Sequence, residues 1–158
     1  MTDCKTILRH ILATISYRFS KSIDDVDCSF YSFQAPNGVR TPIDIINHMA
    51  SVLRYLIKEI SQREPIKPSG FTEDEEIKLF YDLLREADEL LIEAHVPLET
   101  CLILIQGPLA DILTHVGQIS LLRRYFNKPI TGENFMKAKI AIGNLARERQ
   151  DFSNDQFK

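Results

Sequence analysis

The hydrophobic and polar positions of this 158-residue chain alternate with the period of an α-helix over most of its length. Two segments are especially regular, because their apolar residues recur at spacings of three and four, the heptad pattern of packed helices. The apolar positions are Ile43, Ile46, Ala50, Leu53, Ile57 and Ile60 in one segment, and Ile77, Phe80, Leu84, Ala87, Leu91 and Ala94 in the other. No segment of useful length shows the two-residue period of a β-strand. The pattern predicts an all-α protein.

Capping signals mark the starts of these two helices. Thr41, with Asp44 three residues later, is typical of a helix N-terminus, and Thr72 with Glu75 has the spacing of a capping box. The earlier of the two helices should end before Pro65, where a linker over residues 65–70 is expected.

Apolar positions predict three further helices: a first over about residues 2–19, a fourth over 108–126 and a short fifth from residue 131. The Gln106–Pro108 stretch is interpreted as the turn that starts the fourth helix. Four long helices predict a four-helix bundle, in a single domain of residues 1–150 followed by a polar tail, residues 151–158.

A long connection, residues 20–40, separates the first two helices. We expect its aromatic residues Phe30, Tyr31 and Phe33 to anchor it over the bundle. Its length would allow the second helix to run parallel to the first.

Composition excludes several classes of partner. The net charge is −3 and no basic stripe is visible, so a nucleic acid is not expected as a partner. The longest apolar run, residues 101–105, is too short to cross a membrane, and the N-terminus carries no apolar core of a signal peptide. The three cysteines have no motif spacing, which suits reduced thiols in the cytoplasm.

Two histidines are the candidates for chemistry. His115 lies in the middle of the apolar face of the predicted helix 108–126, beside Ile112 and Ile119. A histidine among aliphatic side chains is either a hydrogen-bonded core residue or part of a site. His48, at the edge of the apolar arc of the second helix, is its natural companion. His10 and His95 are both expected at the surface.

The sequence around these histidines resembles a known family. The stretches T-P-I-D-I-I-N-H-M (41–49) and G-P-L-A-D-I-L-T-H-V-G-Q-I-S-L-L-R-R (107–124) are similar to the DinB-like (DinB/YfiT) superfamily, as is N-K-P-I-T-G-E-N-F at 127–135. The resemblance covers roughly residues 7–147. It implies a DinB/YfiT-type four-helix bundle with a long connection between helices 1 and 2 and a short fifth helix.

The resemblance also implies a metal site. The usual site of the family has three histidines, of which His48 and His115 match two, whereas Ile119 stands at the third position. The candidates for a third ligand are Asp111, one turn before His115, and Gln118, three residues after it. Two histidines with a carboxylate form a common catalytic set. Zinc or nickel would fit such a site, with weaker binding than in three-histidine relatives.

Two classes of function stay open from the sequence. Some members of the family look like metal-dependent thiol (S-)transferases, which need an open coordination position. The missing third histidine favours the other class, a non-catalytic bundle that binds a small-molecule ligand or acts in a stress response. In either case Tyr55 and Arg123 are candidates for the rim of the His48–His115 pocket.

A homodimer is also predicted, through apolar helix surface beyond the heptad positions. The extra apolar residues are Ile45, Val52 and Leu56 on the second helix, and Leu79, Leu83 and Leu90 on the third.

Overall fold

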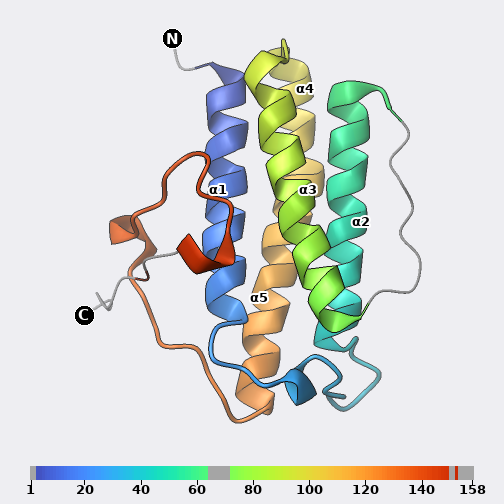
Figure 1. Cartoon of the computed structure of the whole chain (residues 1–158), viewed down its shortest axis with the longest axis vertical. Helices are drawn as coiled ribbons and strands as arrows, with labels where there is room; N and C mark the ends of the chain where they lie inside the picture. Colours follow the sequence, from blue (N-terminus) through green and yellow to red (C-terminus); the bar gives the residue numbers. More distant parts are fainter. Residues whose placement is uncertain (1–2, 64–71, 150–151, 153–158) are drawn as a thin grey trace.

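The computed structural model describes residues 3–63, 72–149 and 152, which form a bundle of long helices (Figure 1). The helices are α1 (Cys4–Ser22), α2 (Pro42–Ser61), α3 (Glu73–Glu93), α4 (Leu98–Leu104) and α5 (Ala110–Tyr125). No strand occurs in these described ranges, so the prediction of an all-α protein is confirmed. The predicted linker at 65–70 and nearly all of the predicted tail lie outside the described residues.

The four long helical segments surround one core. α1 packs against α3 and α5, and α2 packs against the same two helices, so α1 and α2 lie on a diagonal. α1 descends and α2 rises in Figure 1, and α3 runs parallel to α2. The expectation that the first two helices run parallel is therefore wrong. The connection between them is long because it crosses the end of the bundle diagonally.

Aromatic packing anchors this connection, as predicted. Phe30 is fully buried and Tyr31 nearly so. The rings of Phe30 and Phe33 lie 5.3 Å and 5.4 Å from the ring of Phe126, at the end of α5. The connection thus closes the lower end of the bundle, beneath α5.

The predicted capping box at Thr72 is present, and the predicted helix start at Thr41 is a second capping box. The Asp44 backbone N–H donates to the Thr41 hydroxyl at 3.2 Å, and the Thr41 N–H donates back to the Asp44 carboxylate. At the start of α3 the Thr72 N–H donates to the Glu75 carboxylate at 2.8 Å, which lowers the pKa of Glu75. Each box satisfies N–H groups that the first helical turn leaves without partners.

The heptad residues fill the core, and so do residues beyond them. Of the apolar residues that suggested a dimer, Ile45, Leu56 and Leu83 are buried in the single chain, and Val52, Leu79 and Leu90 are half-buried. A dimer stays a prediction, but these side chains already pack inside one bundle. An interface between copies would have to use a different surface.

The fourth helix begins earlier than predicted. α4 starts at Leu98, directly after Pro97, and continues without a break through the π-helical turn η2 (Ile105–Leu109) into α5. The predicted turn at 106–108 is wrong, because Pro108 lies inside the helix. Proline has no N–H and its ring crowds the preceding turn, and a π turn accommodates it by adding one residue there.

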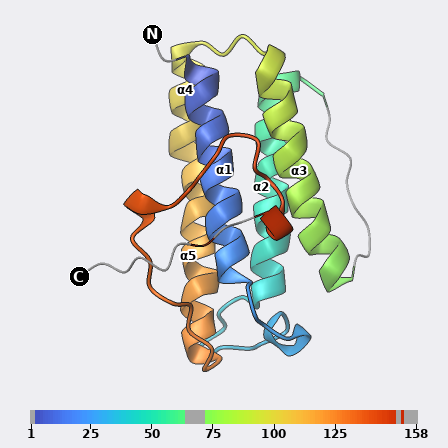
Figure 2. The same cartoon turned by 60° about the vertical axis from the view of Figure 1, so that its left-hand side comes forward.

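The predicted fifth helix is absent. Residues 127–149, here called the C-terminal strap, form two single 3₁₀ turns, η3 (Phe135–Lys137) and η4 (Arg147–Arg149), and otherwise irregular chain over the outside of α1 (Figure 2). Glu133 of the strap is buried and accepts hydrogen bonds from Tyr17 and Lys21 of α1. These hydrogen bonds and the burial of Leu145 in the hydrophobic core hold the strap against the bundle without a helix.

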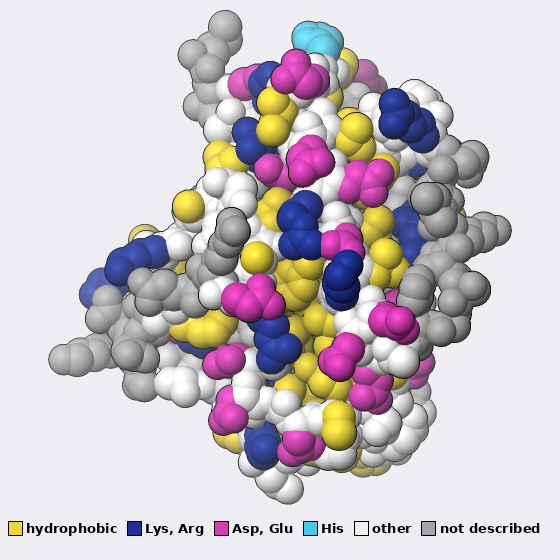
Figure 3. Space-filling model, in the orientation of Figure 1, with side chains coloured by type: hydrophobic (Ala, Val, Ile, Leu, Met, Phe, Trp, Pro, Cys, Tyr) yellow, Lys and Arg dark blue, Asp and Glu magenta, His cyan; other side chains and the backbone are white. Residues whose placement is uncertain are grey.

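The face formed by α1 and α3 has the character of a solvated surface. Acidic and basic side chains are interspersed over it (Figure 3). Arg9 of α1 donates two hydrogen bonds, of 2.8 Å and 2.9 Å, to Asp88 of α3, and this contact raises the pKa of Arg9.

One described helical stretch, Leu98–Tyr125, is long and apolar enough to cross a membrane by length and composition. Its inner side packs in the bundle core, where Leu104, Leu109, Ile112 and Ile119 are all buried. This arrangement is compatible with a soluble protein.

Candidate metal-binding site

His48 and His115 face each other between α2 and α5. Their ring centroids lie 4.6 Å apart, and the ring planes are inclined by 53°. The two residues come from neighbouring helices that pack side by side. The structure therefore brings together the two histidines that the sequence singled out.

Asp111 lies between the two rings. It is one helical turn before His115, so both side chains lie on the same face of α5. One carboxylate oxygen is 3.4 Å from Nε2 of His48, and the other is 3.4 Å from Nδ1 of His115. One ligand atom from each of the three residues lies within 4.8 Å of the other two, the one such cluster found in the described residues.

A backbone hydrogen bond orients His115. Its Nδ1 lies 2.8 Å from the Asp111 carbonyl oxygen, which can only accept, so Nδ1 carries the proton and donates. The lone pair is then on Nε2. Histidines that bind metals usually have this arrangement, in which one nitrogen donates to a carbonyl or carboxylate and the other is the ligand.

The site is buried at its base and open at its mouth. His115 is 8% exposed, whereas the side chains of His48 and Asp111 are 37% and 43% exposed. Asp111 also borders a shallow groove that Tyr55, itself 70% exposed, shares with Thr114. A further ligand or substrate has access from this side.

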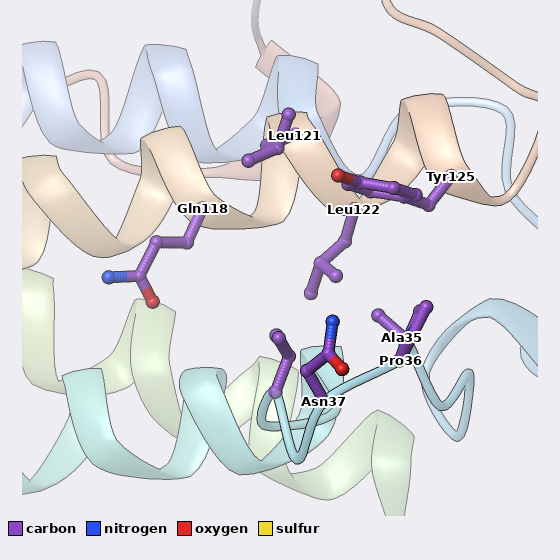
Figure 4. Close-up of a pocket in the computed structure, with 8 residues that line it drawn as sticks. Ala35, Pro36, Asn37, Gln118, Leu121, Leu122 and Tyr125 are labelled. Carbon is purple, nitrogen blue, oxygen red and sulfur yellow. The ribbon is translucent and has the colours of Figure 1, made fainter.

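Gln118 lies in a different hollow. It lines a space of about 210 Å³ between α5 and the loop at 35–39, together with Asn37, Leu122 and Tyr125 (Figure 4). Gln118 is therefore not part of the cluster of three. This hollow was not predicted from the sequence.

Ile119 is fully buried in the bundle core. A residue of the hydrophobic core thus occupies the position at which the family resemblance implies a third histidine. Of the two alternative third ligands, Asp111 is the one whose side chain reaches both histidines.

Arg123 does not lie on the rim of the pocket. It is 5% exposed, and its guanidinium donates to the backbone carbonyls of Lys128 and Asp24. Burial lowers its pKa. Its contacts fix the end of α5 against the connection that follows α1. The sequence placed an arginine pair at the end of this helix but did not show which of the two points inward.

The spacing of the cluster fits a divalent ion with small movements. Metal–nitrogen and metal–oxygen bonds of about 2.1 Å put neighbouring ligand atoms roughly 3.4 Å apart in a tetrahedral site. The His48–Asp111 distance already has this value, and the longest separation in the cluster is within 4.8 Å. A displacement of about 1 Å of the half-exposed His48 ring would bring all three ligand atoms within bonding distance of one ion.

Comparison with family models, curated proteins and solved structures gave no match for this chain.

Proposed function

We propose that this protein is a DinB/YfiT-type helical bundle that binds a divalent metal ion through His48, Asp111 and His115. The observation that carries the proposal is the convergence of two imidazoles and one carboxylate at the open mouth of the α2–α5 cleft. Asp111 replaces the histidine that Ile119 cannot provide. Zinc or nickel suits this nitrogen-rich set of ligands.

Three protein ligands and an open position are the arrangement of catalytic rather than structural zinc sites. A bound divalent ion would supply Lewis acidity, which lowers the pKa of a thiol or water placed at the open position. The residues of the chain orient the ligands and give access to the ion. The Asp111 carbonyl fixes the His115 ring, and the groove beside Tyr55 admits the reactant. A thiol (S-)transferase-like reaction is the enzymatic form of this proposal.

The alternative is a non-catalytic bundle that binds a small ligand. The observation in its favour is the hollow beside Gln118, where apolar residues and two side-chain amides, those of Asn37 and Gln118, surround about 210 Å³ (Figure 4). That volume accommodates only a compact group, below the usual range for drug-sized ligands.

Calorimetric titration of zinc and nickel into chelator-treated protein tests metal binding. We expect one ion per chain for the wild type and loss of this site in His48→Ala. The matched control is His95→Ala, which removes an exposed histidine outside the His48–Asp111–His115 cluster. This variant should bind the metal as the wild type does. Equal binding by the wild type and His48→Ala would refute the assignment.

The two functional classes are separated by a rate measurement. Metal-loaded protein is incubated with a low-molecular-weight thiol and an alkyl electrophile, and consumption of the thiol is followed. Acceleration that requires both the metal and His48 supports the transferase. A normal metal site without acceleration for any thiol tested supports the non-catalytic alternative.

A further inference from the structure

Two of the three cysteines meet where the start of α1 packs against α4. Figure 2 shows these two segments side by side at the upper end of the bundle. The Cys101 thiol donates weakly to the backbone carbonyl oxygen of Cys4, at a distance of 3.9 Å. Burial raises the pKa of Cys101, and so does a hydrogen bond between the two cysteine side chains. The residues are 97 positions apart in the chain, so no sequence spacing could indicate the pair.

Both cysteine side chains belong to the inner faces of their helices. Leu8 lies one turn after Cys4, and Leu104 lies one turn after Cys101, so each cysteine shares a helix face with a leucine. The two leucines and Cys101 are each 1% exposed. Cys4 is half-buried and packs against the same hydrophobic core. The two thiols therefore occupy one contact, which solvent reaches from the side of Cys4.

We propose that Cys4 and Cys101 are a redox-active dithiol, which hydrogen peroxide oxidises to a disulfide within the chain. The half-buried Cys4 is the thiol that peroxide reaches, and the buried Cys101 is the thiol that completes the bond. Disulfides of cytoplasmic proteins are mostly transient and redox-sensing, so such a pair agrees with a chain whose thiols are otherwise reduced. The dithiol is separate from the His48–Asp111–His115 cluster and does not depend on metal binding.

The oxidation takes two steps. The sulfur of Cys4 attacks one peroxide oxygen, the O–O bond breaks, and the products are a sulfenic acid on Cys4 and one water molecule. The sulfur of Cys101 then attacks the Cys4 sulfur and the S–O bond breaks. The departing hydroxide takes the Cys101 thiol proton and leaves as a second water molecule. In total the two thiols lose two hydrogen atoms and two electrons, and one peroxide is reduced to two water molecules.

Low-molecular-weight thiols can reverse the reaction. One thiol attacks the accessible sulfur of Cys4, which breaks the disulfide, releases Cys101 and leaves a mixed disulfide on Cys4. A second thiol attacks this mixed disulfide, frees Cys4 and forms a low-molecular-weight disulfide. The half-burial of Cys4 therefore gives both the oxidant and the reductant access to the same sulfur.

The backbone around the pair permits the small movement that bond formation requires. Two thiols in contact must approach to about 2.05 Å to form a disulfide. Cys4 is the first residue of α1, and first-turn residues move more easily because the first turn lacks intrahelical partners for its N–H groups. Cys101 is held more firmly, since its N–H donates to the Pro97 carbonyl oxygen at 2.9 Å. The movement thus falls on Cys4.

Metal binding is a weaker explanation of the same pair. A structural zinc site needs four ligands and a catalytic one needs three. The one cluster of three metal-ligating side chains in the described ranges contains neither cysteine. Two thiols in contact without a third ligand favour disulfide chemistry.

Oxidation would lock the upper end of the bundle. The disulfide would close a loop that contains all of α2 and α3. Cross-linking a loop of about 100 residues removes conformational entropy from the unfolded chain, so for a chain of this length we expect Tm to rise by roughly 10 °C. The lock would join the start of α1 to α4, the first segment of the long helix that carries Asp111 and His115.

Peptide mass spectrometry without reductant, after peroxide treatment of the full chain, tests the dithiol. The protein is first treated with a chelator and fully reduced, the reductant is removed, and the remaining thiols are alkylated after the reaction. We expect a peptide pair joined through Cys4 and Cys101, lighter by two hydrogen atoms than the two reduced peptides. The oxidised protein should keep a mass of 18.2 kDa on a non-reducing gel, and dithiothreitol should restore both thiols.

Substitutions separate the roles of the cysteines. Cys28→Ser removes the exposed thiol of the connection after α1 and is the matched control, which should form the disulfide as the wild type does. Cys101→Ala should stop at the sulfenic acid of Cys4, which dimedone traps. Cys4→Ala should leave Cys101 reduced, because peroxide does not reach a buried thiol. Circular dichroism checks the fold of each variant, and the wild-type spectrum tests the pair without any substitution.

Three results would overturn the proposal. The first is the absence of a Cys4–Cys101 link at a peroxide dose that oxidises the exposed Cys28. The second is a link that forms only in urea, since the two thiols would then meet only in the unfolded chain. The third is an equal Tm for the oxidised and the reduced protein, which would show that the disulfide does not lock the folded bundle.

Discussion

Replacement of Ile119 by histidine tests whether position 119 belongs to the core and cannot hold a metal ligand. If so, Asp111 is left as the third candidate ligand. Ile119 is fully buried and belongs to the main hydrophobic core. The family resemblance places a metal-ligating histidine at this position. In the structure the Ile119 side chain packs in the hydrophobic core instead, so Ile119→His should destabilise the folded chain.

The size of the effect follows from burial. Removing the isoleucine side chain from the core costs about 2 kcal/mol of apolar burial. Placing an imidazole there without a hydrogen-bond partner adds about 1–3 kcal/mol. A total of about 3–5 kcal/mol corresponds to a fall of roughly 10 °C in Tm for a domain of this length.

Thermal unfolding followed by circular dichroism, with chelator present, measures this cost without any contribution from metal. The control is Ile119→Val, which keeps the site apolar and should cost only about 0.5–1.5 kcal/mol. A Tm for Ile119→His within about 2 °C of the wild type would refute the reasoning, since it would mean that the imidazole reaches solvent or a polar partner.

Three further predictions concern other parts of the molecule. Asp111→Asn should weaken zinc binding by at least about 100-fold in a competition titration, given roughly 3 kcal/mol per ligand; an unchanged affinity would remove Asp111 from the site. Glu133→Ala should lower the free energy of unfolding in urea by about 3–5 kcal/mol, because it leaves the buried Lys21 ammonium without its carboxylate. A loss below about 1 kcal/mol would show that this contact does not hold the C-terminal strap. Under native conditions a maleimide should modify the exposed Cys28 far faster than Cys101, because burial shields Cys101 and raises its pKa; equal rates would contradict the structure.

The bounds of α2 and α3 could be predicted almost to the residue because their signals are local. The capping residues Thr41 and Thr72 satisfy N–H groups of the turn that they precede, so the sequence carries the whole interaction. Pro108 was misread for the opposite reason. A proline near an apolar run usually starts a helix, and its inclusion in η2 depends on packing of the surrounding turns against other helices.

The candidate site was predictable only in part. His48 and His115 stood out because of their positions on apolar helices and the family resemblance. The choice between Asp111 and Gln118 needed the position of α2, because Asp111 reaches His48 of that helix whereas Gln118 faces the loop at 35–39. The burial of Arg123 depends on the carbonyl groups of distant loops, which no helical wheel represents.

Anomalous diffraction at the zinc edge from crystals of the zinc-loaded protein tests the central claim most directly. The account predicts one strong peak per chain in the α2–α5 cleft, within about 2.1 Å of imidazole nitrogens from His48 and His115 and of a carboxylate oxygen from Asp111. A peak at other residues, or a peak in the cleft without Asp111 among its ligands, would contradict it.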